Sequence, residues 1–103
     1  MVDYEELLKG LDDRDYDRLA RVFCLARAQG KNDLAVRIAM KLHNNEVWAE
    51  LPKYKRSAFL WEYGQALEVV GNRELAKSLY RSILRATDNE PYREMARERI
   101  GML

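Results

Sequence analysis

The chain contains an internal repeat. The segment GKNDLAVRIAMKL, which starts at Gly30, returns as GNRELAKSLYRSIL, which starts at Gly71. Both copies carry the same buried pattern at spacing i, i+1, i+4, i+5 and i+8, namely Leu34, Ala35, Ile38, Ala39 and Leu42 in the first and Leu75, Ala76, Leu79, Tyr80 and Ile83 in the second. Only a helix places this spacing on one face. The repeat therefore predicts an all-α chain of tandem antiparallel helical hairpins.

The same period extends to the rest of the chain. We expect main helices over residues 16–29, 32–44, 54–70, 73–87 and 91–102, a short acidic helix from Tyr4 to Leu8, and a long connection over 46–53. Gly30 and Gly71 form the hairpin turns, and Asn32 and Asn72 are the expected N-caps of the helices that follow. Val22 and Leu25 add a second apolar face to the helix over 16–29, which predicts neighbours on two sides.

The last predicted helix is expected to cap the array. It carries an apolar stripe at helical spacing, formed by Tyr92, Met95, Ala96, Ile100 and Leu103. The remaining positions hold charged residues that we expect to face water, which are Arg93, Glu94, Arg97 and Glu98. A terminal helix with one apolar face buries that face against the preceding hairpin.

The two hairpins place their bulky residues on opposite helices. The first offers Phe23 on its first helix and Ala39 on its second, whereas the second offers Gly64 and then Tyr80. If these residues face each other, the summed volume of each pair is roughly conserved, which is the condition for a tolerated core rearrangement.

At this point the second hairpin resembles a tetratricopeptide repeat (TPR), whose pattern combines W-x2-L-G-x2-Y, A-x3-F and a proline. The matching residues are Leu60, Tyr63, Gly64, Leu67, Ala76 and Tyr80, with Gly71 at the turn and Pro91 a few residues late. A weaker match in the first hairpin consists of Leu19, Val22, Phe23, Ala26, Ala35 and Ala39. The resemblance implies one TPR-like domain over 1–103, with repeats at about 16–44 and 57–87 and a capping helix over 91–102. The copies lie further apart than the family's period of about 34 residues, and two repeats are fewer than the three usually needed.

The resemblance also implies a concave groove lined by the first helix of each hairpin. Repeat position places Asp17, Ala20, Cys24 and Arg27 in it from the first hairpin, and Ala58, Trp61, Gln65 and Glu68 from the second. Trp61 is the expected anchor, because tryptophan is enriched among residues that dominate interface energetics. The Lys and Asn residues with which some family members clamp a terminal carboxylate are missing. The leading hypothesis is a non-catalytic adaptor or chaperone-like module that binds a peptide segment or helix of another protein.

Charge leaves two alternatives open. The formal charge is +1, from 18 Lys and Arg against 17 Asp and Glu, which argues against a surface built wholly for nucleic acid or anionic lipid. Residues 1–17 hold seven acidic and two basic residues, so the remainder carries +6, and self-assembly of acidic end on basic end is one alternative. The other is a nucleic-acid-binding helical repeat that uses a basic stripe formed by Lys77, Arg81 and Arg85.

The sequence does not predict an enzyme, a cofactor or a metal site. Asp13, Asp15 and Asp17 have the spacing that opens a calcium loop, but Arg18 and Cys24 stand where that loop needs its glycine and closing glutamate. His43 and Cys24 are the only histidine and cysteine, so no metal cluster is expected. Neither a secretory signal nor an apolar run of about 20 residues is visible, and we expect a cytoplasmic protein without a membrane partner.

Overall fold

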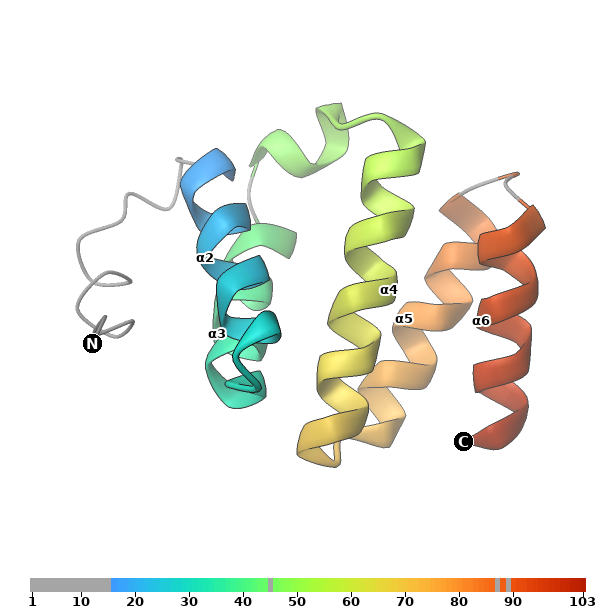
Figure 1. Cartoon of the computed structure of the whole chain (residues 1–103). Helices are drawn as coiled ribbons and strands as arrows, with labels where there is room; N and C mark the ends of the chain where they lie inside the picture. The colour runs from blue at the N-terminus through green and yellow to red at the C-terminus, as the bar shows by residue number, and fades with distance from the viewer. Residues whose placement is uncertain (1–15, 45, 87, 89) are drawn as a thin grey trace. The chain divides into compact units, whose positions relative to one another are not determined.

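The computed structural model describes residues 16–44, 46–86, 88 and 90–103, and this part of the chain contains five α-helices, one 3₁₀ helix and no strand (Figure 1). The elements are α2 (Tyr16–Ala28), α3 (Asn32–His43), η1 (Glu46–Glu50), α4 (Lys53–Val70), α5 (Arg73–Ala86) and α6 (Glu90–Met102). The all-α prediction is confirmed, and every predicted boundary of these five helices falls within one residue of the observed one. The helix predicted from Tyr4 to Leu8 lies outside the described residues.

The contacts divide the chain into two compact units, residues 1–50 and 51–103. In the first unit α2 packs against α3, and in the second α4 packs against α5, while α6 contacts both of these helices. Each unit therefore has its own helical hairpin, and the second adds α6.

Both hairpins turn at a glycine with the same backbone geometry. Gly30 and Gly71 have φ values of 73° and 89°, a region that favours glycine because it has no Cβ. The amide after each glycine donates back over five residues, from Lys31 to the Ala26 carbonyl and from Asn72 to the Leu67 carbonyl, each at 2.8 Å. This Schellman arrangement satisfies helix-end carbonyls that otherwise have no partner in the helix.

The two turns differ in how they cap the next helix. Asn72 precedes α5, and its side-chain Oδ1 accepts a hydrogen bond from the Leu75 amide at 3.3 Å, as predicted. The predicted cap at Asn32 is wrong, because α3 begins at Asn32 itself, and Lys31 stands at the N-cap position, where its side chain makes no capping hydrogen bond to the helix. Asn32 Oδ1 instead accepts a 2.6 Å hydrogen bond from Arg27 Nη1. The asparagine comes one residue later after the glycine in the first copy, which moves it past the capping position.

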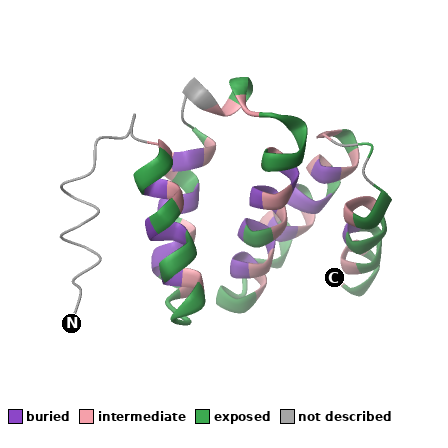
Figure 2. Ribbon diagram, turned by 45° about the horizontal axis from the view of Figure 1, so that its top comes forward, coloured by how far each residue is buried: buried purple, intermediate pink, exposed green. Residues whose placement is uncertain are grey.

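The repeated stripe forms the cores of both hairpins (Figure 2). Its buried members are Leu34, Ala35, Ile38, Ala39 and Leu42 on α3, and Ala76, Leu79, Tyr80 and Ile83 on α5, whereas Leu75 is half-buried. The first helices supply Leu19, Val22, Phe23 and Ala26 from α2 and Leu60, Tyr63, Gly64 and Leu67 from α4. The predicted second face of α2 is not covered at Leu25, whose side chain is exposed.

Gly64 and Tyr80 face each other across the second hairpin. A Cβ atom on Gly64 would lie 2.7 Å from Cε1 and 2.9 Å from Cζ of the Tyr80 ring. Tyr80 is fully buried, so the ring has little room to move away. Glycine at position 64 is therefore required by the close approach of the ring, which confirms the predicted pairing of a minimal residue with a bulky one.

The capping helix differs from its prediction. Of its apolar stripe only Ala96 is buried, Tyr92, Ile100 and Leu103 are half-buried, and Met95 is exposed. Arg93 does not face water as predicted, because its Nη1 donates to the Leu84 carbonyl near the C-terminal end of α5. A carbonyl in the last turn of a helix has no partner within that helix, and a cation there is favourable. Polar bonds thus hold α6 where apolar burial is incomplete.

The predicted connection over 46–53 contains the short helix η1. Trp48 in η1 contacts the ring of His43 at the end of α3, with ring centroids 5.0 Å apart in a T-shaped arrangement. This contact ties η1 to α3. Among the described residues, no helix has both the length and the apolar character needed to cross a bilayer.

Candidate protein-binding surface

The predicted groove residues belong to two different units, so each half is described by itself. On α2 they form one stripe along the helix, with Asp17 and Cys24 exposed and Ala20 and Arg27 half-buried. Arg27 is engaged with Asn32, as described above. The part of this stripe that is open to a partner consists of Asp17, Ala20 and Cys24.

A shallow hollow lies on the same side of α2. It is lined by Ala20, Arg21, Cys24 and Leu25, and Leu25 is 50% exposed. We call this surface the α2 hollow. The sequence analysis did not include Arg21 and Leu25 among the binding residues. The signal for Leu25 was its position, because it is apolar and lies outside the stripe that enters the hairpin core.

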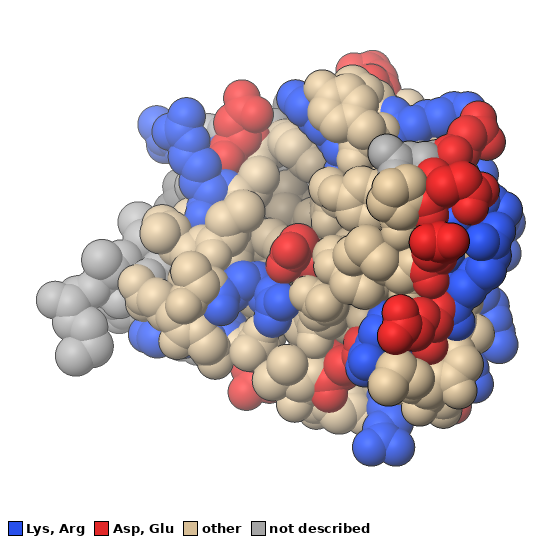
Figure 3. Space-filling model, turned by 45° about the vertical axis from the view of Figure 1, so that its right-hand side comes forward, with Lys and Arg blue, Asp and Glu red and all other residues tan. Residues whose placement is uncertain are grey.

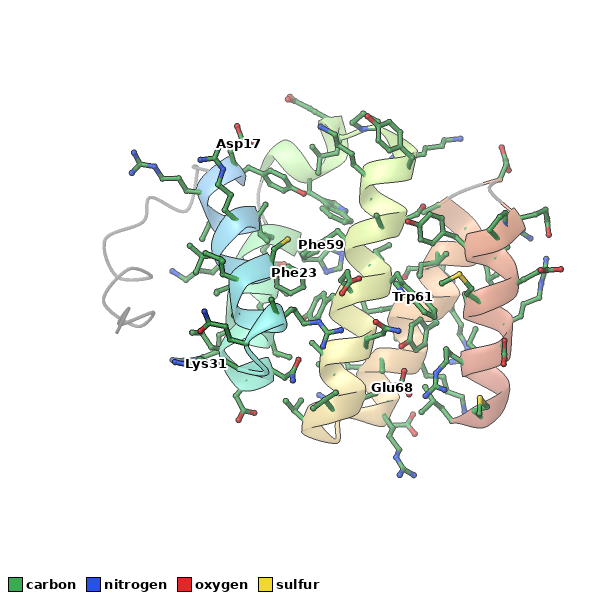
Figure 4. The ribbon with its side chains drawn as sticks, in the orientation of Figure 1. Asp17, Phe23, Lys31, Phe59, Trp61 and Glu68 are labelled. Atoms are coloured by element: carbon green, nitrogen blue, oxygen red, sulfur yellow. The ribbon has the colours of Figure 1, made fainter. Side chains whose placement is uncertain are left out.

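The predicted residues on α4 are all half-buried, and two of them contact other helices of their own unit. The ring of Trp61 packs against the ring of Tyr80, with centroids 5.4 Å apart and planes tilted by 49°. In Figure 4, Trp61 and Glu68 both point toward the side of α4 that faces α5 and α6. Ala58 and Gln65 lie on the same stripe. Trp61 therefore contributes to packing within the second unit.

Glu68 is the centre of a polar cluster that joins three helices. Its carboxylate accepts a hydrogen bond from the Tyr80 hydroxyl on α5 and pairs with Arg99 on α6 through both oxygens. The Glu68 side chain is only 15% exposed. Burial by itself would raise the pKa of Glu68, but the bonds from Arg99 and Tyr80 outweigh it and lower this pKa. The pKa of Tyr80 is raised, first by burial and then by its bond to the carboxylate. A charged Glu68 therefore stabilises the α4–α5–α6 arrangement.

The predicted basic stripe lies on α5, in the second unit. Arg81 and Arg85 are exposed and Lys77 is half-buried. Arg85 Nη2 donates to Ser82 Oγ at 3.2 Å. Like charges four residues apart destabilise an isolated helix by about 0.2 to 0.5 kcal/mol per pair. Arg85 is favourable in the last turn of α5, whereas helix stability gives no reason for Lys77 and Arg81 beside it. We call Lys77, Arg81 and Arg85 the α5 basic stripe.

Charges elsewhere in the second unit are more mixed. On α6, the Glu90 carboxylate pairs with two arginines. Its Oε1 lies 3.4 Å from Arg93 Nε, and its Oε2 lies 3.6 Å from Arg97 Nη1. In the view of Figure 3, acidic and basic side chains alternate along the right-hand edge.

The side chains that could bind a metal ion or act as a nucleophile lie apart in the structure. Within the described part of the chain, no group of three or more His, Cys, Asp and Glu side chains could hold a metal ion. His43 lies on α3 against Trp48, and burial lowers its pKa, whereas Cys24 is an exposed free thiol on α2. Asp17 is exposed in the first turn of α2, and Asp13 and Asp15 lie outside the described residues.

No protein-family model, curated protein or solved structure matches the chain.

Proposed function

We propose that the chain is a TPR-like helical-repeat module that binds a peptide segment or helix of another protein without catalysis. Three features of the hairpins support the repeat assignment. Both hairpins have a glycine turn with the same hydrogen bonds and a buried stripe at the same register. In the second hairpin, the large residue that the alignment of the two copies predicts lies against a glycine. Helical-repeat arrays generally present an extended surface to another macromolecule.

The α2 hollow is the observation that carries the proposed function. The repeat register aligns Leu25 with Ala66 on α4, and Ala66 is completely buried, whereas Leu25 is 50% exposed. Ala20 and Cys24 extend the open surface beside it. The first hairpin therefore exposes apolar surface at a position that the second hairpin buries. Apolar surface with a charged residue at its edge can bury an apolar side chain of a partner.

The charges around the hollow define the chemistry of the partner. Arg21 lines the hollow, and Asp17 is exposed one turn toward the N-terminal end of α2. An amphipathic helix that places a small apolar side chain against Ala20 and Leu25 fits this surface. We expect it to carry a carboxylate opposite Arg21 and a cation opposite Asp17, because complementary charges fix the register of docking.

The α4 half of the predicted groove is the weaker candidate. Trp61 already packs on Tyr80, and Glu68 is bonded to Tyr80 and Arg99. A partner that used these side chains would have to displace contacts within the second unit. We therefore place the partner first on α2.

Two variants with equally exposed starting residues test this proposal. Leu25 and Met40 are each 50% exposed, but Leu25 lines the α2 hollow and Met40 lies on α3. Proteins retained by the immobilised wild-type chain from its native cells are quantified beside those retained by Leu25→Glu and Met40→Glu. A partner that binds the hollow is lost with Leu25→Glu and kept with Met40→Glu, and circular dichroism confirms that both variants are folded. Equal retention by both variants, or no specific retention by the wild type, contradicts the proposal.

A further inference from the structure

The α5 basic stripe is a second surface that the proposed function does not use. Its three cations follow one another at four-residue spacing, so they extend over about 12 Å of the helix. Arg73 continues the series by one more turn toward the start of α5 and is also exposed. None of Lys77, Arg81 and Arg85 has an ion pair with another described residue.

The stripe is absent from the first hairpin, although the two copies share their register. The residues of the first copy that align with Lys77, Arg81 and Arg85 are Val36, Met40 and Asn44, which carry no charge. The fold is therefore built without these cations in α3. Arg85 stands in the last turn of α5, where a cation is favourable, but Lys77 and Arg81 lie before that turn. Neighbouring like charges oppose helix formation, so the accumulation of all three indicates an anionic ligand rather than a structural need.

The exposed face of α5 lacks the features of a protein-binding site. Its exposed residues are Arg73, Glu74, Ser78, Arg81 and Arg85. The residues that dominate protein interfaces are Trp, Tyr and Arg in an apolar, fully desolvated centre, and the exposed residues of this face include arginines but no apolar or aromatic side chain beside them. Contacts to a nucleic-acid backbone, in contrast, come mainly from Arg, Lys and hydroxyl side chains.

We infer that the outer face of α5 binds the phosphodiester backbone of a nucleic acid without reading its sequence. Arg81 and Arg85 contact phosphate oxygens, Lys77 extends the contact by one turn, and the exposed hydroxyl of Ser78 donates to the same strand. The absence of an exposed aromatic side chain on this face leaves no platform on which bases stack. Binding is weak because the formal charge of the whole chain is only +1. It falls as the salt concentration rises, because the contacts are between cationic side chains and phosphates.

The test measures binding of the full chain to a fluorescent duplex of about 20 base pairs over roughly 20 to 200 mM KCl. Three phosphate contacts predict that the logarithm of the association constant falls with the logarithm of salt concentration at a slope of about −3. The triple variant Lys77→Gln, Arg81→Gln, Arg85→Gln is expected to bind at least tenfold more weakly at the lowest salt and to show a nearly flat dependence.

A scattered triple variant controls for net charge. Arg37→Gln, Lys55→Gln and Arg97→Gln remove one exposed cation each from α3, α4 and α6 and change the formal charge by the same amount. This control is expected to keep most of the affinity and the slope. Three results overturn the inference: no binding by the wild type at the lowest salt, equal losses in both triple variants, or equal competition by polyglutamate at matched charge. The last result assigns the stripe to an acidic protein segment instead.

Discussion

The two hairpins share a backbone plan and differ in what stabilises it. Both turn at a glycine with positive φ and bury the same stripe on the second helix. The second hairpin adds contacts from α6 and the cluster around Glu68, whereas the first has none of these among its described residues. Repetition therefore fixes the turns and the core, and residues outside the shared pattern supply the specific contacts.

The first helices of the two hairpins show the same contrast. The residues Phe59 and Ala66 are buried on α4, whereas the residues aligned with them on α2, Arg18 and Leu25, are exposed. The repeat pattern thus specifies which face enters the hairpin core. How much of the remaining circumference is covered depends on contacts outside that core.

The largest expected effect concerns which helix of the hairpin carries the bulky core residue. Tyr80→Ala leaves a large cavity beside Gly64 and removes the ring against which Trp61 packs, so we expect it to lower the free energy of unfolding by about 3 to 5 kcal/mol. Adding Gly64→Phe gives the second hairpin the arrangement of Phe23 and Ala39 in the first. We expect this second change to restore at least about 1 kcal/mol, because the summed volume is recovered. Urea unfolding followed by circular dichroism measures both values.

The control for this exchange is Gly64→Phe alone. In the wild-type background the new ring collides with Tyr80, so the single variant is expected to be strongly destabilised. If Gly64→Phe is as harmful with Tyr80→Ala as without it, the two positions do not exchange volume and the comparison with the first hairpin fails.

The second prediction removes the charge from the cluster that only the second hairpin has. Glu68→Gln weakens the bonds to Arg99 and Tyr80, and we expect a loss of about 1 to 2 kcal/mol at neutral pH, since Arg99 is partly exposed and water screens the pair. Because the pKa of Glu68 is lowered below its ordinary value of 4.5, its contribution is complete above that value. It is lost as the pH falls through the folded-state pKa.

Thermal unfolding of wild type and Glu68→Gln at several pH values checks this dependence. The difference between them is expected to shrink on acidification below about pH 4.5, because protonated Glu68 no longer attracts Arg99. A difference that stays constant with pH means that Glu68 acts through packing alone.

The sequence was sufficient for the helices and the hairpin core because these depend on local periodicity and on volumes that repeat. The large and small pair of Gly64 and Tyr80 could be found by aligning the two copies. The contacts of α6 could not be predicted from the sequence, because nothing in the sequence of this charged helix distinguishes Arg93, Arg97 and Arg99 from one another. Only the way that α6 lies on α5 and α4 determines that Arg93 reaches the Leu84 carbonyl and Arg99 reaches Glu68.

The candidate site was less accessible to sequence analysis. Repeat position assigned Cys24 to the predicted groove, and its side chain is exposed on α2, but repeat position gave no information on the neighbours of α4. Trp61 looked like an anchor because it lies beside the buried stripe, and its contact with Tyr80 depends on how two helices cross. The binding function, the partner and the cytoplasmic location remain predictions.

The third prediction exchanges the residues at the two N-cap positions. Asn72→Lys removes the bond to the Leu75 amide and should cost about 1 kcal/mol, whereas Lys31→Asn offers α3 a cap that it lacks and should gain about 0.5 kcal/mol. The double variant tests whether the effects add. If Lys31→Asn stabilises nothing, a side-chain cap adds nothing at the first turn, and the two turns do not differ energetically in their caps.

The smallest expected effect is a pH response that only the first unit has near neutrality. Burial lowers the pKa of His43 below its ordinary value of 6.5, so the unfolded chain takes up a proton at higher pH than the folded chain does. The first unit is therefore expected to be most stable above pH 6.5 and to lose stability as the pH falls below it. The change should be modest because His43 is only half-buried. Urea midpoints of wild type and His43→Gln between about pH 5 and 8 measure it. A wild-type midpoint that follows that of His43→Gln throughout this range would show that the His43 ring titrates alike in the folded and unfolded chain, and the contact with Trp48 would then provide packing without a pH dependence.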